Sequence, residues 1–282
     1  MKFYKQRTQP FAGRDVLQKK RERLNKKMAV LIIVMLFSQL FSQGEWLPGT
    51  AHTLHQGRWE YGLFQPIRWG QSEDREISFY KLTALLMPGA SVKQSWLQRY
   101  DWIVSSSHSV YYPTPLLKMV TKEGIGGMIS PEFDIPNMVS LWNMVLASKQ
   151  LKQNKIFTAK AGIAIAFGGG DLAVESTIDL PLVYHRLAVY YNSWLLRFGS
   201  DINGRMNEKW TYLVDGDLFI IPGMKGSFAL EHKGMVSWEK SSRFHISLGY
   251  KMVYGQYPDG YPNENITRLH ILPMIDFVWS RE

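Results

Sequence analysis

The stretch Arg243-Phe-His-Ile-Ser-Leu-Gly-Tyr-Lys-Met-Val-Tyr254 decides how the rest of the chain is interpreted. Apolar or aromatic residues occupy every second position from Phe244 to Tyr254, and most of the positions between them are polar or small. Successive side chains of an extended strand point to opposite faces, so this alternation predicts a β-strand with one apolar face. The stretch has twelve residues, whereas a strand in a globular protein usually has about 5–6 and a tilted strand that crosses a bilayer needs about 9–11.

The same alternation recurs along the chain. Ten further segments carry it: 58–63, 76–86, 90–97, 100–111, 137–148, 157–167, 187–198, 210–220, 226–238 and 268–279. Between them, Arg68 to Arg75 is interpreted as a polar turn, and Gly168 to about Tyr184 as a loop that leads into more strand. Because bacterial single-chain barrels have even strand numbers, either a twelfth strand lies within Asp171 to Leu180 or one of these eleven segments is not a strand. We expect about 12 strands (10–14) in all.

The fold class that follows is all-β, an antiparallel transmembrane β-barrel, with a soluble β-sandwich as the alternative. Aromatic residues gather near the predicted strand ends, as they do in the girdles at the two membrane interfaces. They are Trp59, Trp69, Trp102, Phe157, Phe167, Trp210, Trp238, Tyr254, Phe277 and Trp279. Closure pairs every backbone polar group, which hydrocarbon requires. Strand length and aromatic placement therefore favour the barrel.

The N-terminal region has the layout of a secretory signal peptide. Ten Lys or Arg residues fall within residues 1–43, and an apolar run begins at Met28 and ends at Phe41, before small or polar residues. The run is shorter than the roughly 20 residues of a transmembrane helix. We expect a basic leader and signal peptide over 1–43, a loose arm over 44–57 and a single barrel domain over 58–282, in the outer membrane.

Charge argues against a nucleic-acid partner. The net charge is +9, but residues 1–43 carry ten basic and two acidic residues, which leaves +1 for the remainder. A nearly neutral body lacks the basic surface that binds a phosphate backbone. The chain has no cysteine, and the sequence predicts no cofactor. Outer-membrane lipid and the export and barrel-assembly machinery are the expected partners.

The segment near residues 112–136 interrupts the strand pattern. Thr114-Pro115 is interpreted as a helix N-cap followed by proline at the first helical position. We expect one short helix there, ending near Gly124. An insert of this kind between two long strands can enter a barrel lumen or cover its mouth.

The signal peptide, the alternating strands and the aromatic terminal strand resemble outer-membrane β-barrel proteins of Gram-negative bacteria. More narrowly, three segments resemble barrel proteins of Bacteroidota-type bacteria, a group whose motifs imply no particular activity. These segments are His108 to Leu117, Asp179 to Tyr184 and Tyr254 to Pro258. The chain departs from the usual pattern at its C-terminus, because Ser280-Arg-Glu282 follow the aromatic Trp279.

The sequence contains residues of two kinds of chemical site. His108 and Ser109 provide a base and a nucleophile of the types that an outer-membrane acyl hydrolase uses, but the chain has no GxSxG motif. His52 and His55 are the closest pair of histidines, and they lie in the predicted loose arm, so we expect no metal site.

The side chains opposite the apolar faces are the better functional candidates. The predicted lumen-lining residues are Lys160, Glu231, Lys233, Arg243, His245, Lys251, Arg268 and His270. Charges of both signs around a water-filled passage control which solutes pass. The sequence therefore favours a non-enzymatic passive channel for small polar solutes. A closed structural barrel that presents loops 168–184 and 255–265 to a partner is the alternative, and an acyl hydrolase is a third hypothesis.

Overall fold

The computed structural model describes residues 49–63, 65–79, 88–121, 132–152, 154–168, 172–173, 181–222, 228–258 and 265–281. Residues 46–282 form one compact unit, and the account below concerns that unit alone. The predicted leader and signal peptide over 1–43 lie outside the described residues.

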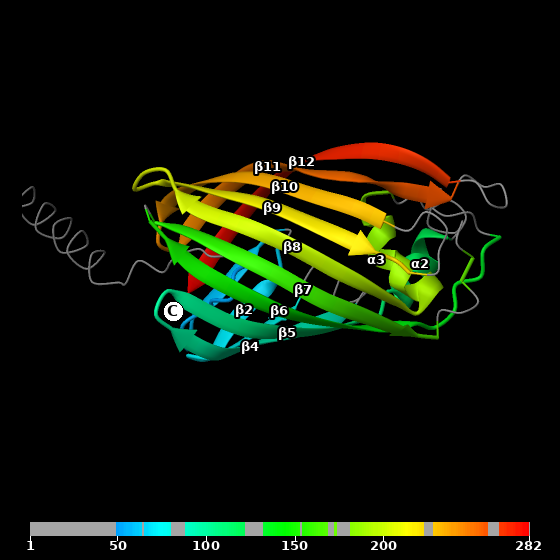
Figure 1. Ribbon diagram of the computed structural model, residues 1–282, viewed down its shortest axis with the longest axis horizontal. Coiled ribbons are helices and arrows are strands. Elements are labelled where there is room, and N and C mark those ends of the chain that lie inside the picture. The colour runs from blue at the N-terminus through cyan, green and yellow to red at the C-terminus, as the bar shows by residue number, and fades with distance from the viewer. Residues whose placement is uncertain are drawn as a thin grey trace, which may run out of the picture. The chain divides into compact units, whose positions relative to one another are not determined.

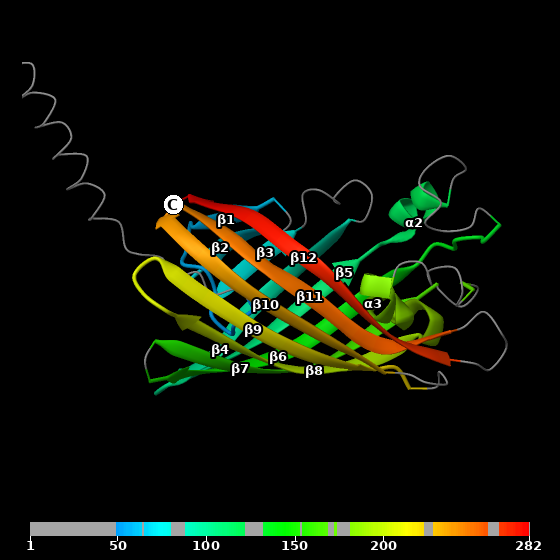
Figure 2. The ribbon, with the colours of Figure 1, turned by 90° about the horizontal axis from the view of Figure 1, so that it is seen from above.

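Twelve strands form a closed antiparallel β-barrel (Figures 1 and 2). The strands are β1 (Trp59–Gly62), β2 (Ile67–Ser72), β3 (Arg75–Phe79), β4 (Gly89–Arg99), β5 (Trp102–Tyr111), β6 (Val139–Leu151), β7 (Lys155–Phe167), β8 (Trp194–Arg205), β9 (Trp210–Ile220), β10 (Phe228–Ser241), β11 (Phe244–Pro258) and β12 (Asn265–Arg281). Each pairs with the next, and β1 closes the ring against β12, from Trp59 opposite Arg281 to Gly62 opposite Val278. The predicted fold class and strand number are confirmed.

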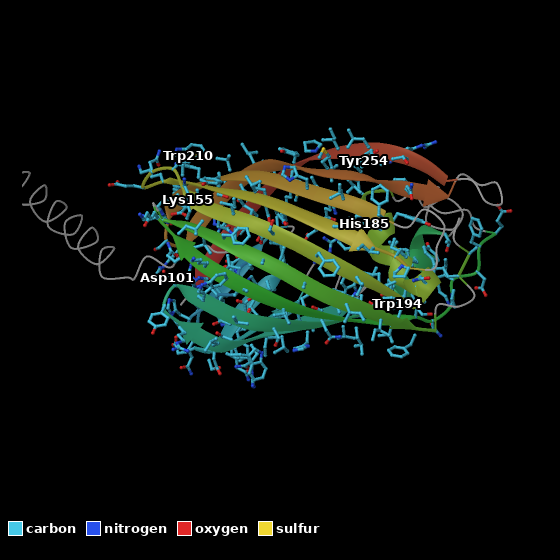
Figure 3. The ribbon with its side chains drawn as sticks, viewed as in Figure 1. Asp101, Lys155, His185, Trp194, Trp210 and Tyr254 are labelled. Carbon is cyan, nitrogen blue, oxygen red and sulfur yellow. The ribbon has the colours of Figure 1, made fainter. Side chains whose placement is uncertain are left out.

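The apolar face of the strands lies on the outside of the barrel. On β11, Leu248, Tyr250 and Tyr254 are exposed, whereas Ser247 and Val253 on the opposite face are buried inside. A sandwich would bury the first set between two sheets, so this exposure fits contact with hydrocarbon. Aromatic side chains lie near both ends, with Trp210 toward one end and Trp194 toward the other (Figure 3). The barrel is therefore of the transmembrane type.

The two ends of the barrel differ. One end, here the turn end, carries the short connections β2–β3, β4–β5, β6–β7, β8–β9 and β10–β11. The other, the loop end, carries the longer ones, including the helices α2 (Thr114–Val120) and α3 (Pro181–Asn192) (Figure 1). Among the described residues, neither helix is long and apolar enough to cross a membrane.

The twelfth strand is not where the sequence placed it. The prediction of a polar turn over Arg68 to Arg75 is wrong, because Ile67–Ser72 forms β2 and the turn is limited to Glu73 and Asp74. Ile67 and Trp69 face outward while Arg68 and Gly70 face inward. The alternation covers only these four residues before polar Gln71 and Ser72, so the segment resembled a turn. The predicted strand within 171–180 falls almost wholly outside the described residues.

Both helical segments depart from the sequence prediction in detail. Residues 187–192 were predicted as strand, but Pro181 begins α3, which continues to Asn192. Proline at the start of a helix loses no hydrogen bond, and the apolar side chains of α3 find an apolar surface inside the barrel. The predicted short helix near 112–136 is confirmed as α2, although Pro113 occupies the N-cap position in place of Thr114.

Candidate functional site in the barrel interior

The N-terminal arm crosses the lumen at the turn end. The Ala51 amide donates a hydrogen bond to Ser148 Oγ on β6 (2.8 Å), and the Leu54 amide donates one to Glu76 Oε2 on β3 (3.1 Å). Lys93 Nζ on β4 donates to the His52 carbonyl (2.9 Å). Thr50 and Ala51 are fully buried. Residues 49–57 were predicted to form a loose arm, but hydrogen bonds attach them to several strands of the inner wall.

Gly70 on β2 provides the space for this arm. The Gly57 amide donates to the Gly70 carbonyl (2.8 Å), and a Cβ added to Gly70 would lie 2.0 Å from the His55 carbonyl oxygen. We expect Gly70→Ala to displace the arm and lower the free energy of unfolding by about 1–3 kcal/mol, as overpacking does. Thermal unfolding in detergent measures this effect. Gly216→Ala is the matched control, because an added Cβ there meets nothing within 4 Å. Equal stability of the two variants would contradict the close packing of the arm.

A buried ion-pair network lies beside the arm. Arg68 Nη1 is 2.9 Å from Glu60, and Arg68 Nη2 is 2.8 Å from Glu76. Arg58 Nε lies 3.0 Å from Glu60, and Lys93 Nζ lies 3.6 Å from Glu76. Bidentate arginine contacts of this kind fix the geometry of both partners. The network joins β1, β2, β3 and β4, three of which are short strands.

A second network surrounds Lys160 on β7. Its Nζ lies 2.5 Å from Asp201 on β8 and 2.6 Å and 3.1 Å from Asp215 and Asp217 on β9. Arg197 contacts Asp217 at 2.5 Å. A buried ammonium ion requires compensating charge, and three carboxylates on two neighbouring strands supply it. The arrangement depends on the register, which sets Asp201 opposite Asp215.

A third network attaches α3 to the wall through Glu231 on β10. The carboxylate lies 2.7 Å from His185 Nε2 and 2.6 Å from Arg186 Nη2, both on α3. Lys251 Nζ on β11 is 3.0 Å away from the same group. The contacts of His185 and Arg186 with this buried carboxylate attach the helix to the wall, and Lys251 adds a third cationic partner from the wall itself.

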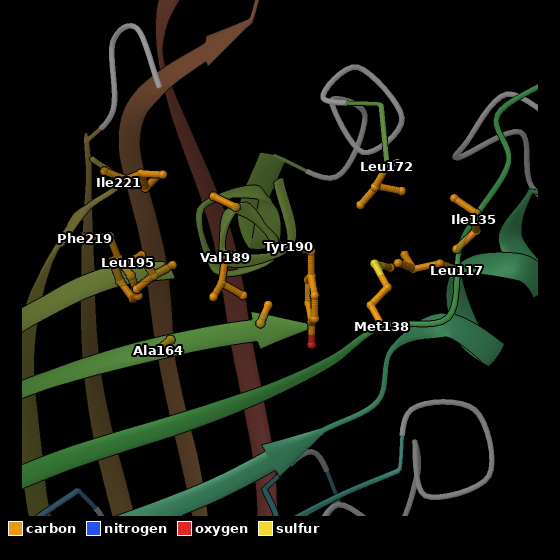
Figure 4. Close-up of a cluster of buried hydrophobic side chains, with 13 residues drawn as sticks. Leu117, Ile135, Met138, Ala164, Leu172, Val189, Tyr190, Leu195, Phe219 and Ile221 are labelled. Atoms are coloured by element: carbon orange, nitrogen blue, oxygen red, sulfur yellow. The ribbon is translucent and has the colours of Figure 1, made fainter. Parts of the chain in front are cut away.

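Apolar packing supplements these ion pairs (Figure 4). Ala188, Val189 and Tyr190 of α3 are buried, and the Tyr190 hydroxyl lies 2.7 Å from Ser140 Oγ on β6. The wall residues of the same cluster are Ala164, Ala166, Leu195, Phe219 and Ala229. The inward-facing alanines leave room for a helix, so α3 occupies the lumen near the loop end. Figure 3 shows His185 inside the ring of strands.

Most of the predicted lumen-lining residues do face inward. Lys160, Glu231, Lys233, His245 and Lys251 lie inside, and all of them except His245 belong to the networks with Asp215, Asp217 and α3. Arg268 and His270 lie on the inward side of β12, with Arg268 exposed. Arg243 is exposed in the turn between β10 and β11, so it does not line the lumen.

Several functional residues were missed by the sequence analysis. They are Arg58, Glu60, Arg68, Glu76, Lys93, Arg186, Arg197, Asp201, Asp215 and Asp217. Asp201, Asp215 and Asp217 fall at alternate positions opposite apolar residues, which was an available signal. The charged residues of α3 gave no such signal, because that segment was predicted to be loop and strand.

The hydrolase pair does not assemble. His108 faces outward, where its Nδ1 lies 2.8 Å from Asn143 Oδ1 and its Nε2 lies 3.0 Å from Ser106 Oγ. Ser109 faces inward and donates to no histidine; its Oγ lies 2.7 Å from Ser91 Oγ. Neighbouring residues of one strand point to opposite faces, so they cannot form a base–nucleophile pair. Among the described residues, no group of three or more His, Cys, Asp or Glu side chains could hold a metal ion.

The fold and its interior define a class: a twelve-stranded transmembrane β-barrel whose lumen holds an N-terminal arm and a helix. No family model matches the sequence, and no curated protein matches it. Among solved structures, an outer membrane channel from Pseudomonas putida F1 is similar with a TM-score of 0.44, 8% identity, and coverage of 84% of this chain and 100% of that one. The outer membrane channel DcaP of Acinetobacter baumannii has a TM-score of 0.32, 10% identity, and coverage of 86% and 68%.

Proposed function

We propose that the protein is a non-enzymatic outer-membrane channel through which small polar solutes diffuse passively. The observation that carries the proposal is the inner wall near mid-barrel, where charged side chains stay accessible to water. The side chain of Lys233 is 29% exposed and that of Arg186 is 34% exposed. Water-accessible charged groups inside a transmembrane ring of strands are the kind of lining that a polar passage through the apolar layer needs.

The same proposal covers location and orientation. Outer-membrane barrels have short periplasmic turns and longer extracellular loops, so the turn end would face the periplasm. Export by the N-terminal signal peptide, insertion by the barrel-assembly machinery and kinship with Bacteroidota-type barrels are parts of the proposal that rest on the sequence.

Single-channel recording in planar bilayers tests the function. We expect the purified, folded protein to give discrete current steps, small because α3 and the arm narrow the lumen. The same preparation after boiling is the control, since an unfolded chain leaves no ring of strands. A protein that stays folded by heat-modifiable migration in detergent but gives no steps would contradict the channel.

A second candidate function is a closed structural barrel that presents its loops to a partner. The observation that favours it is the filling of both ends, by residues 49–57 at the turn end and by α3 at the loop end. The proposed presenting loops, 168–184 and 255–265, lie largely outside the described residues. The absence of current together with retention of a folded partner in a pull-down would support this candidate over the channel.

A further inference from the structure

We infer that the passage selects small anions, an inference that rests on the proposed channel function. The observation behind it is that the cation and the carboxylate of an ion pair are not equally exposed to water. Lys233 is 29% exposed and its partner Asp215 only 9%. Arg186 and Lys251 are 34% and 16% exposed, against 6% for Glu231. Arg197 is 14% exposed and Asp217 only 1%. In these four pairs the cation is more accessible than the carboxylate that binds it. The order is reversed for Lys160, which is 4% exposed against 9% for Asp215, and for Arg58, which is 3% exposed against 4% for Glu60.

Two of these cations lie side by side because of the strand register. Lys233 on β10 is the direct cross-strand partner of Lys251 on β11. Like charges directly opposite each other are normally destabilising. Here Asp215 flanks Lys233 on one side, and Glu231 contacts Lys251 on the other. The carboxylates hold the two ammonium groups together while lying against the wall, so a solute in the lumen meets the ammonium groups first.

The charge count agrees with this accessibility. The two mid-barrel networks hold five cationic side chains, Lys160, Arg186, Arg197, Lys233 and Lys251, against four carboxylates, Asp201, Asp215, Asp217 and Glu231. At the turn end, three cations meet two carboxylates, and Arg68 and Lys93 are again more exposed than Glu60 and Glu76.

The other described inward-facing groups do not reverse the excess of positive charge in the lumen. On β4 and β5, Ser91 and Ser109 contribute hydroxyls that hydrogen-bond each other. Asp276 on β12 is buried and accepts hydrogen bonds from the amides of Leu63 and Gln65. In the pair between Arg205 and Glu239 the arginine is the more exposed member, 26% against 13%. Cationic linings of this kind favour the entry of anions and disfavour cations.

The solute class is therefore small and anionic, such as chloride or a short carboxylate. Exposed ammonium and guanidinium groups attract carboxylate and halide by charge and by hydrogen bonding. A large anion is excluded because α3 occupies the lumen near the loop end.

The test is the reversal potential of the purified protein in a neutral phospholipid bilayer under a gradient of potassium chloride. We expect the sign that chloride diffusion produces. In the double variant Lys233→Gln/Lys251→Gln, the chloride-to-potassium permeability ratio should fall by about threefold or more, because two accessible charges are removed. Lys152→Gln in the exposed β6–β7 turn is the control, with the same chemical change and an unchanged ratio.

The outcomes separate the inference from the function on which it rests. Current steps with a zero or potassium-type reversal potential, or a double variant that behaves like Lys152→Gln, overturn anion selectivity and leave the channel in place. The absence of steps from folded wild-type protein overturns the channel and the selectivity with it. Heat-modifiable migration of each variant verifies that the barrel has folded before its currents are compared.

Discussion

Replacing Lys160 by methionine is expected to destabilise the barrel strongly, lowering the free energy of unfolding by about 3–5 kcal/mol. The lysine is the shared cation of three buried carboxylates. Without it, Asp217 keeps Arg197 and Asp215 keeps Lys233, whereas Asp201 loses the one cation that contacts it among the described residues. An uncompensated buried charge costs far more than the ion pair contributes. Denaturant unfolding in detergent measures the loss.

A double substitution identifies the cause. Lys160→Met combined with Asp201→Asn should recover part of the lost stability, because the second change removes the charge left unpaired. Lys152→Gln, in an exposed turn, should stay within about 0.5 kcal/mol of the wild type. If the double variant is no more stable than Lys160→Met alone, the unpaired charge of Asp201 is not the reason for the loss.

Alternation was sufficient to predict the barrel wall. Phe244 to Tyr254 of the quoted stretch lies in β11, and 157–167 lies in β7, each with its alternating apolar set outside. Alternation predicts these strands because their outward face lies in a uniform apolar medium. Every second residue must therefore be apolar. The prediction failed at β2, where the alternation covers only Ile67 to Gly70 and polar residues follow, so the short strand was taken for part of a turn.

The interior could be predicted only in part, for a related reason. Lys160 and Glu231 were recognised as inward-facing from their own strands, but their partners come from neighbouring strands and from α3. Which carboxylate meets which cation depends on the register between strands, and a single sequence does not give it. The helix α3 was missed because its residues have no strong amphipathic period: the helix is surrounded by wall on several sides, from β6 to β12.

Glu231→Gln is expected to displace α3 and enlarge the passage. The substitution keeps the size of the side chain but removes the charge that His185, Arg186 and Lys251 share. Hydrogen bonds to a charged group contribute about 1.5–3 kcal/mol, which shifts the equilibrium between the seated and the displaced helix by about tenfold to a hundredfold. The apolar cluster around Val189 keeps the helix attached for part of the time. We therefore expect longer or larger open states in single-channel recordings.

Glu239→Gln is the matched control, because it makes the same chemical change on the same face of β10. Glu239 binds Arg205 near the turn end, far along the strand from α3. Removing its charge should therefore leave the open states as they are in the wild type. If Glu231→Gln and Glu239→Gln change the currents equally, the effect comes from the charge of the lumen and not from α3. If Glu231→Gln alone enlarges them, the helix is the constriction, and Glu231 is the residue that holds it closed.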